Sequence, residues 1–183
     1  MFIFQKQEKT YEYFCYDVIV IRRSDSRGDT ESSGRITLAS DSFNNGDFLA
    51  SEYSCEGKNL SPELHWTYHG KAESFAVTCE DPDAPGGTFV HWVIYNIPDS
   101  VKKLPKGFPK SSPGDGSLQG VNDFGETGYN GPCPPPGKPH RYIFTVYALD
   151  AKIADKNLRL AEFKKLIKGH VLGSAAITGM YRR

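Results

Sequence analysis

The sequence lacks both a long apolar run and an excess of charge of either sign. No stretch approaches the roughly 20 apolar residues that a membrane-spanning helix needs. Acids and bases number 22 each, so the formal net charge is zero. Nucleic acids and anionic membrane surfaces generally select basic proteins. We therefore expect no nucleic-acid partner and no transmembrane segment.

Cysteines are also scarce. The four cysteines of the 183-residue chain are too few for a disulfide scaffold, and they include no Cys-x-x-Cys pair of the kind that binds zinc. The first residues contain no basic segment followed by a long apolar core, so a secretory signal is not expected. These features predict a cytoplasmic protein without a metal or other cofactor.

The composition changes near residue 34. Residues 11–21 are aromatic and β-branched, which is typical of a strand, whereas residues 22–34 are polar with mixed charges, which is typical of a linker. We interpret residues 1–34 as an N-terminal extension, either an extra strand or a linker. Residues 35–183 then form the main domain, since their number suits a single core.

Most of this domain reads as short strands. β-Branched and aromatic runs predict strands at residues 36–39, 64–66, 74–79, 89–97, 142–149 and 175–181. Residues 89–97 and 142–149 are apolar at nearly every position, so we expect both to be covered on both faces at the centre of the fold.

Only one helix is predicted convincingly. Phe163, Leu166, Ile167 and Val171 follow helical spacing within residues 158–172, and Gly173 is placed to end the helix. Short strands with one or two late helices predict a mainly β fold, an antiparallel β-sandwich with peripheral helices near the C-terminus.

Two rigid loops carry most of the chemistry. One runs through residues 80–92 and the other through residues 131–142, and each combines proline and glycine and leads into a strand. The second closes an irregular segment, residues 104–139, that holds eight of the twelve prolines. Long connections of this kind are commonly functional. We expect the two loops to meet and form one pocket.

The titratable residues of these loops are Asp81, Asp83, His91 and His140. Taken singly, each has an ordinary structural role, because aspartates in turns bind backbone N–H groups and histidines at strand starts are commonly packed. Together, two imidazoles that can be cationic suit a phosphate or carboxylate, and a free carboxylate suits an ammonium group. The combination favours a small anionic or zwitterionic ligand.

The sequence supports neither a metal site nor a serine nucleophile in these loops. Asp81, Asp83 and two histidines offer metal-ligand atoms, but their spacing matches no metal motif. No Gly-x-Ser-x-Gly elbow marks a nucleophile. A hydrolase in which His140 and Asp83 activate a water stays open as the alternative to a binding protein.

The two loops resemble the signature blocks of phosphatidylethanolamine-binding proteins, in particular the bacterial and archaeal branch described as Raf kinase inhibitor-like. The resemblance rests on motifs spread over residues 36–181: Asp81-Pro-Asp-Ala-Pro85, His91-Trp92, Gly137-x-Pro-His140-Arg-Tyr142, Tyr53-Ser-Cys-Glu-Gly-Lys-Asn-Leu-Ser-Pro62 and Gly131-Pro-Cys-Pro-Pro-Pro-Gly137.

This resemblance implies a Greek-key β-sandwich with a small anion pocket at one end. It implies no enzymatic activity, a phosphorylated or zwitterionic ligand, homodimerisation, and a possible kinase or protease partner. Carried over by motif, the pocket residues are Asp81, Asp83, His91, Gly131, Pro132, His140 and Tyr142. Gly131 is expected to offer its backbone N–H.

Further expectations concern individual positions. We expect a cis Ala84–Pro85 bond in the tight first loop, and an approach of Cys55 to Cys133 that oxidation could close. Asp83 is expected to orient a histidine ring, while Asp81 anchors the loop or meets a ligand amine. If the two histidines act as cations, anion affinity should fall as pH rises through neutrality.

The exposed surface around the pocket is the expected dimer interface. It is predicted to include Phe108, Phe124 and Tyr129 from the proline-rich segment. Trp92 or a loop proline is expected to close the pocket wall, and Cys79 is expected to belong to the core.

Overall fold

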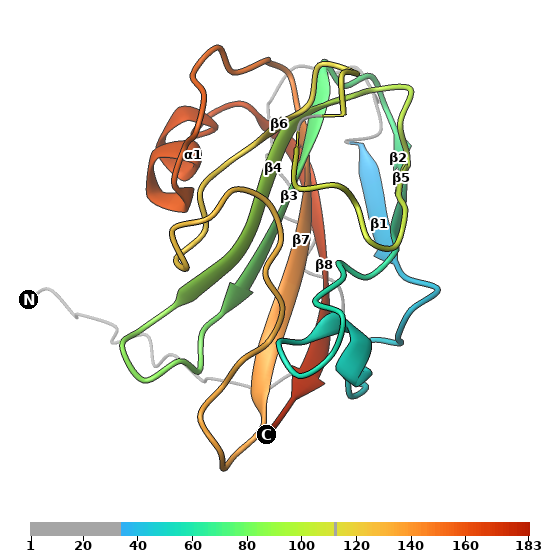
Figure 1. Cartoon of the computed structure of the whole chain (residues 1–183). Coiled ribbons are helices and arrows are strands. Elements are labelled where there is room, and N and C mark those ends of the chain that lie inside the picture. The colour runs from blue at the N-terminus through green and yellow to red at the C-terminus, as the bar shows by residue number, and fades with distance from the viewer. Residues whose placement is uncertain (1–33, 112) are drawn as a thin grey trace, which may run out of the picture.

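A computed structural model describes residues 34–111 and 113–183. Almost all of the predicted N-terminal extension lies outside these residues. Within them the chain forms two antiparallel sheets, as predicted (Figure 1). No helix in the described part of the chain is long and apolar enough to span a membrane.

The larger sheet has five strands in the order β6-β4-β3-β7-β8. Their bounds are Leu118–Gln119 for β6, Phe89–Pro98 for β4, Ser74–Asp81 for β3, His140–Leu149 for β7 and Val171–Tyr181 for β8. β3 forms a hairpin with β4, and β7 returns after the long connection to pair with the other edge of β3. This return is the Greek-key connection that the family resemblance implied.

The smaller sheet has the order β1-β2-β5, with bounds Arg35–Ala39, Leu64–His69 and Lys103–Leu104. A short 3₁₀ helix, η1 (Ser51–Tyr53), precedes β2. Apolar side chains of β1 and β2, such as Ile36 and Trp66, pack against Phe75, Val77 and Phe144 of the larger sheet. The two sheets thus enclose one core, which is the predicted β-sandwich.

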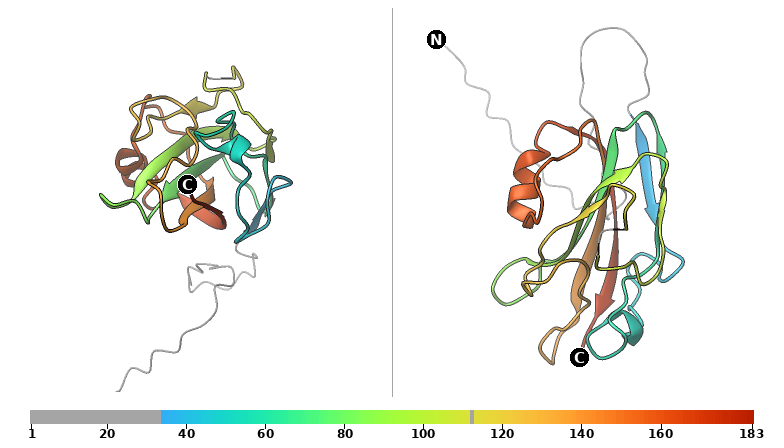
Figure 2. Two further views of the ribbon diagram at one scale, coloured as in Figure 1. Left: turned by 60° about the horizontal axis from the view of Figure 1, so that its bottom comes forward. Right: turned by 45° about the horizontal axis from the view of Figure 1, so that its top comes forward.

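A second apolar cluster lies on the outer face of the five-stranded sheet, where α1 (Leu160–Leu166) covers it (Figure 2). Phe163 of α1 is fully buried, with its ring centroid 5.9 Å from that of Tyr95 and 6.1 Å from that of Tyr147. The central strands are therefore buried on both faces, which explains why β3, β4 and most of β7 carry few exposed polar residues.

The helix is shorter than predicted. It ends at Leu166, and Gly169, three residues later, has a positive φ of +91°. A glycine in this left-handed conformation is a common helix stop. Val171 and Leu172, which the helical pattern had included, are exposed residues at the start of β8, and Gly173 pairs with Ala148 inside the sheet.

Candidate ligand-binding site

The strand pairing brings the two predicted loops together. Because β3 is antiparallel to both β4 and β7, its C-terminal end lies beside the start of each (Figure 1). Asp81 at the end of β3 pairs with Phe89, the first residue of β4, while Glu80 pairs with Ile143 of β7. Residues separated by about 60 positions in the sequence are thus neighbours at one end of the sheet.

The loop between β3 and β4 is a hydrogen-bonded turn. The backbone N–H of Gly87 donates to the carbonyl of Ala84 at 3.0 Å, and Gly87 has a φ of +103°. No cis peptide bond occurs in the described residues, so the expected cis Ala84–Pro85 bond is wrong. Proline at the second position of such a turn suits a trans bond, because its fixed φ matches the turn.

Asp81 connects the two loops. Its carboxylate is buried, with Oδ2 accepting a hydrogen bond from His140 Nδ1 at 2.8 Å and Oδ1 accepting one from the backbone N–H of Asp83, also at 2.8 Å. The first bond orients the His140 ring and requires the proton to be on Nδ1. The second fixes the turn. Asp81, and not Asp83 as predicted, therefore holds the histidine.

Asp83 binds Arg141 instead. Arg141 Nη2 and Nε donate to the two oxygens of Asp83 at 2.7 and 2.8 Å, and the Arg141 backbone N–H adds a third bond at 2.9 Å. The sequence motif could not show this, because it gives neither the register of β7 nor the direction of the side chain. Asp83 acts as a clamp between the first loop and β7.

This clamp gives the fold an acid-sensitive component. The hydrogen bond from Arg141 holds the pKa of Asp83 at about 2, below its ordinary value. The pair therefore stabilises the folded state above the ordinary aspartate pKa of about 3.9, and this contribution is lost as pH falls toward about 2. We expect the thermal midpoint of the wild type to fall more steeply over this range than that of Asp83→Asn. Parallel acid profiles would contradict the assignment.

His91 is buried in an aromatic environment. Its Nδ1 donates to the carbonyl of Asn130 at 2.7 Å, and its ring lies edge-on to Tyr142 and Phe124, with centroids 5.1 and 5.5 Å away. Burial lowers the pKa of His91. The ring is thus favoured as the neutral form, with Nε2 as an acceptor, and the predicted cationic role does not suit it.

Tyr142 contributes a hydroxyl whose hydrogen-bonding capacity is unused. The hydroxyl is buried without a hydrogen-bond partner of good geometry among the described residues. Burial, followed by the nearby Asp81 carboxylate, raises its pKa far above the ordinary value, so the group stays protonated. A buried hydroxyl without a partner carries a desolvation penalty, which a ligand atom would relieve.

These side chains line a cavity of about 280 Å³. Asp81, His91, His140 and Tyr142 supply its polar part. Its other walls are mainly apolar: Ala84, Pro85, Phe89, Phe124, Cys133, Pro134 and Pro135. Loop prolines close the wall as expected, whereas Trp92 is fully buried and donates from Nε1 to Gln119. Phe89 and Phe124 were not predicted as pocket walls; Phe89 was predicted only as part of a strand and Phe124 as part of the surface around the pocket.

The remaining predicted site residues lie beside this cavity and do not line it. The Gly131 N–H, predicted to meet a ligand, donates to Asn59 Oδ1 at 2.7 Å, and the Pro132 carbonyl accepts from the backbone of Cys55. Gly131 is required for packing, since a Cβ there would lie 2.0 Å from the Tyr53 carbonyl oxygen. Both residues support the wall of the cavity from behind.

A disulfide joins the loop that carries these residues to the segment after η1. Cys55 and Cys133 are bonded, with their Cα atoms 5.4 Å apart, which confirms the predicted approach. Since Cys133 lines the cavity, the bond also fixes part of its wall. Cys79 is free and fully buried in the sandwich core, as predicted.

Comparison with known proteins agrees with this fold. The family model for phosphatidylethanolamine-binding proteins matches residues 39–182. A UPF0098 protein of Methanothermobacter thermautotrophicus is 43% identical over 151 residues, covering 81% of this chain and 99% of its own. The UPF0098 protein YbhB of Escherichia coli is 45% identical over 132 residues, covering 69% of this chain and 84% of its own.

Solved structures show the same relationship. Escherichia coli YbcL, described as a member of the mammalian PEBP family, superposes with a TM-score of 0.75 at 37% identity, covering 81% of this chain and 98% of that one. The PEBP homologue CT736 of Chlamydia trachomatis gives a TM-score of 0.74 at 33% identity, with coverages of 81% and 97%. The chain belongs to the phosphatidylethanolamine-binding protein family.

Proposed function

We propose that this chain is a non-catalytic binding protein whose cavity takes a small phosphate-like or phosphoethanolamine-type headgroup. The observation that carries the proposal is the convergence of His140, His91 and the unpartnered Tyr142 hydroxyl on one small cavity. A buried polar cluster of this kind favours a ligand that completes its hydrogen bonds.

The polar groups suit a phosphoryl group that carries a proton or an amine. The Tyr142 hydroxyl offers a donor, and the second ring nitrogen of His140 is available because Nδ1 is bonded to Asp81. Nε2 of neutral His91 accepts, so it favours a ligand O–H or N–H. The volume of about 280 Å³ is small beside that of sites for drug-sized molecules, about 300–1,000 Å³.

The apolar walls favour a ligand that is more than a bare ion. Phe89, Phe124 and the loop prolines would pack against a short carbon chain next to the phosphoryl group. Free phosphate and the headgroup of a lipid share the same charged chemistry. An affinity for phosphoethanolamine above that for phosphate would show that the ethanolamine part, its carbon chain or its amine, contributes.

A hydrolase is the second candidate, since His140 and Asp81 have the geometry of a base and the group that orients it. The predicted partner Asp83 is replaced by Asp81 in this arrangement. The lining of the cavity contains no serine or threonine, and Cys133 is in a disulfide. Such a hydrolase would have to activate water directly, which makes the binding function the better supported one.

A titration followed by NMR of the histidine side chains tests the binding function. Addition of phosphoethanolamine is expected to shift the ring resonances of His91 and His140 until they saturate. His170 is the internal control. It is half-exposed and hydrogen-bonded to Asp150, far in the sequence from the two cavity histidines, and its ring resonances should not shift. Unchanged resonances of both cavity histidines at millimolar ligand would contradict the proposal.

We also propose that the protein forms homodimers through the surface beside the cavity, where a kinase or protease partner could also dock. Phe124 supports this idea because it is 41% exposed at the cavity rim. Tyr129, predicted to be exposed, is buried, and Phe108 packs against the core. A stable interface should bury at least about 1,000 Å². Sedimentation of wild type and Phe124→Asp at micromolar concentration would separate a dimer from a monomer.

A further inference from the structure

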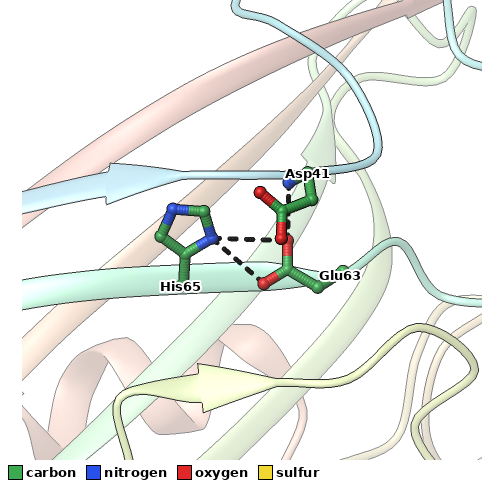
Figure 3. A group of neighbouring side chains, drawn as sticks. All are labelled: Asp41, Glu63 and His65. Carbon is green, nitrogen blue, oxygen red and sulfur yellow. Dashed lines mark hydrogen bonds and ion pairs between the residues drawn. The ribbon is translucent and has the colours of Figure 1, made fainter.

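A second group of chemically active side chains lies in the smaller sheet, and none of its members lines the cavity described above. Asp41 follows β1, Glu63 precedes β2, and His65 is the second residue of β2 (Figure 3). One nitrogen or oxygen atom from each lies within 4.8 Å of the others. The β1–β2 pairing brings them together, since Ala39 is the register partner of His65.

The backbone around Glu63 holds this group in place. The N–H of Asp41 donates to Glu63 Oε2 at 2.6 Å, the Glu63 N–H donates to Ser42 Oγ at 3.0 Å, and Ser40 Oγ donates to the Glu63 carbonyl. Glu63 is buried, and its side chain is only 8% exposed. It faces His65, whose Nδ1 lies 3.0 Å from Oε1 (Figure 3). The donor atoms of Glu63 and His65 are therefore positioned before any ligand arrives, whereas the side chain of Asp41 is 70% exposed.

The charge of this group is only partly compensated by the protein. The ammonium of Lys103 lies 3.1 Å from Glu63 Oε1 and 3.3 Å from Asp41 Oδ2. One positive charge therefore faces two carboxylates when the imidazole is neutral. Lys103 belongs to the two-residue strand β5 and its side chain is 56% exposed, so the ammonium can move into solvent. A divalent cation in its place would balance both carboxylates.

We propose that Asp41, Glu63 and His65 bind a divalent transition-metal ion, with Zn²⁺ as the best fit, in exchange for the Lys103 ammonium. Carboxylate oxygens and an imidazole nitrogen are Zn²⁺ ligands at about 2.0–2.2 Å. An imidazole ligand disfavours Mg²⁺ and Ca²⁺, which prefer oxygen only. His65 would bind through Nδ1 with its proton on Nε2, and three protein ligands would leave a position for water.

Zinc titration of the full chain tests this site. Calorimetry on protein stripped with a chelator is expected to show one saturable Zn²⁺ site and no Mg²⁺ binding. His65→Ala should weaken Zn²⁺ binding by more than about tenfold, since even indirect support of a metal ligand is worth that much. Lys103→Met should tighten it, because the competing ammonium is removed.

Two histidine variants serve as controls. His170→Ala removes a half-exposed imidazole that is also paired with an aspartate, and His140→Ala removes the imidazole of the cavity. Both should keep the wild-type zinc affinity. The side chain of His65 is half-buried and that of Lys103 is exposed, so their variants should fold, as circular dichroism can verify. Zinc binding that does not saturate, that survives His65→Ala, or that weakens in Lys103→Met would overturn the proposal.

Discussion

Replacing both Cys55 and Cys133 by serine is expected to lower the free energy of unfolding by about 2–5 kcal/mol. The two cysteines are 78 positions apart, so their bond removes a large amount of conformational freedom from the unfolded chain. The bond also joins the segment after η1 to the wall of the cavity. We therefore expect the double variant to be less stable than the wild type and also to bind ligand less tightly.

Denaturant unfolding of the double variant beside oxidised and reduced wild type measures this effect. Reduced wild type should match the serine variant, because the same constraint is missing from both. If all three forms unfold at the same denaturant concentration, the disulfide does not contribute to stability.

His140→Ala is expected to weaken phosphoethanolamine binding by about 1.5–3 kcal/mol, the range for a hydrogen bond to a charged group. The loss would also leave the buried Asp81 carboxylate without its imidazole partner. His91→Ala should weaken binding less, since burial lowers the pKa of His91 and its ring meets the ligand as a neutral acceptor. His69→Ala, on the exposed end of β2, provides a matched control.

Calorimetric titration of the four proteins separates these outcomes. Equal affinities for wild type and His140→Ala would mean that the ligand lies elsewhere. Thermal unfolding of each variant shows whether a lost affinity reflects a lost fold. A variant that unfolds at the wild-type temperature and yet binds weakly identifies His140 as part of the site.

The longer strands were predictable because their signals are local, whereas the two-residue strands β5 and β6 were not predicted. Continuous apolar runs at residues 89–97 and 142–149 correspond to β4 and β7, which are covered on both faces. The helix boundary was not predictable in the same way. Val171 and Leu172 continue a helical pattern in the sequence, but the conformation of Gly169 stops the helix before them. The backbone conformation of one glycine thus overrides the helical spacing of the apolar side chains.

The site was predictable as a group of residues but not as a set of bonds. The motifs place Asp81, His91, His140 and Tyr142 at one cavity, and strand pairing explains why. The partner of each aspartate depends on the direction of its side chain. Asp81 anchors the loop as expected but also binds His140, the role expected of Asp83, and Asp83 binds Arg141. Likewise, the Gly131 N–H donates a hydrogen bond to the side chain of Asn59, which lies in a distant loop.

A crystal structure with bound phosphoethanolamine tests the central claim most directly. The proposal predicts density for the phosphoryl group in the cavity, within hydrogen-bonding distance of His140 Nε2 and the Tyr142 hydroxyl. The carbon chain should lie against Phe89, Phe124 or the loop prolines. A second hollow, lined by Asp83, Lys138, Pro139, Arg141 and Met180, shares His140 with the cavity and offers further basic groups outside it. Density for the ligand in that hollow, with the cavity unchanged, would contradict the account.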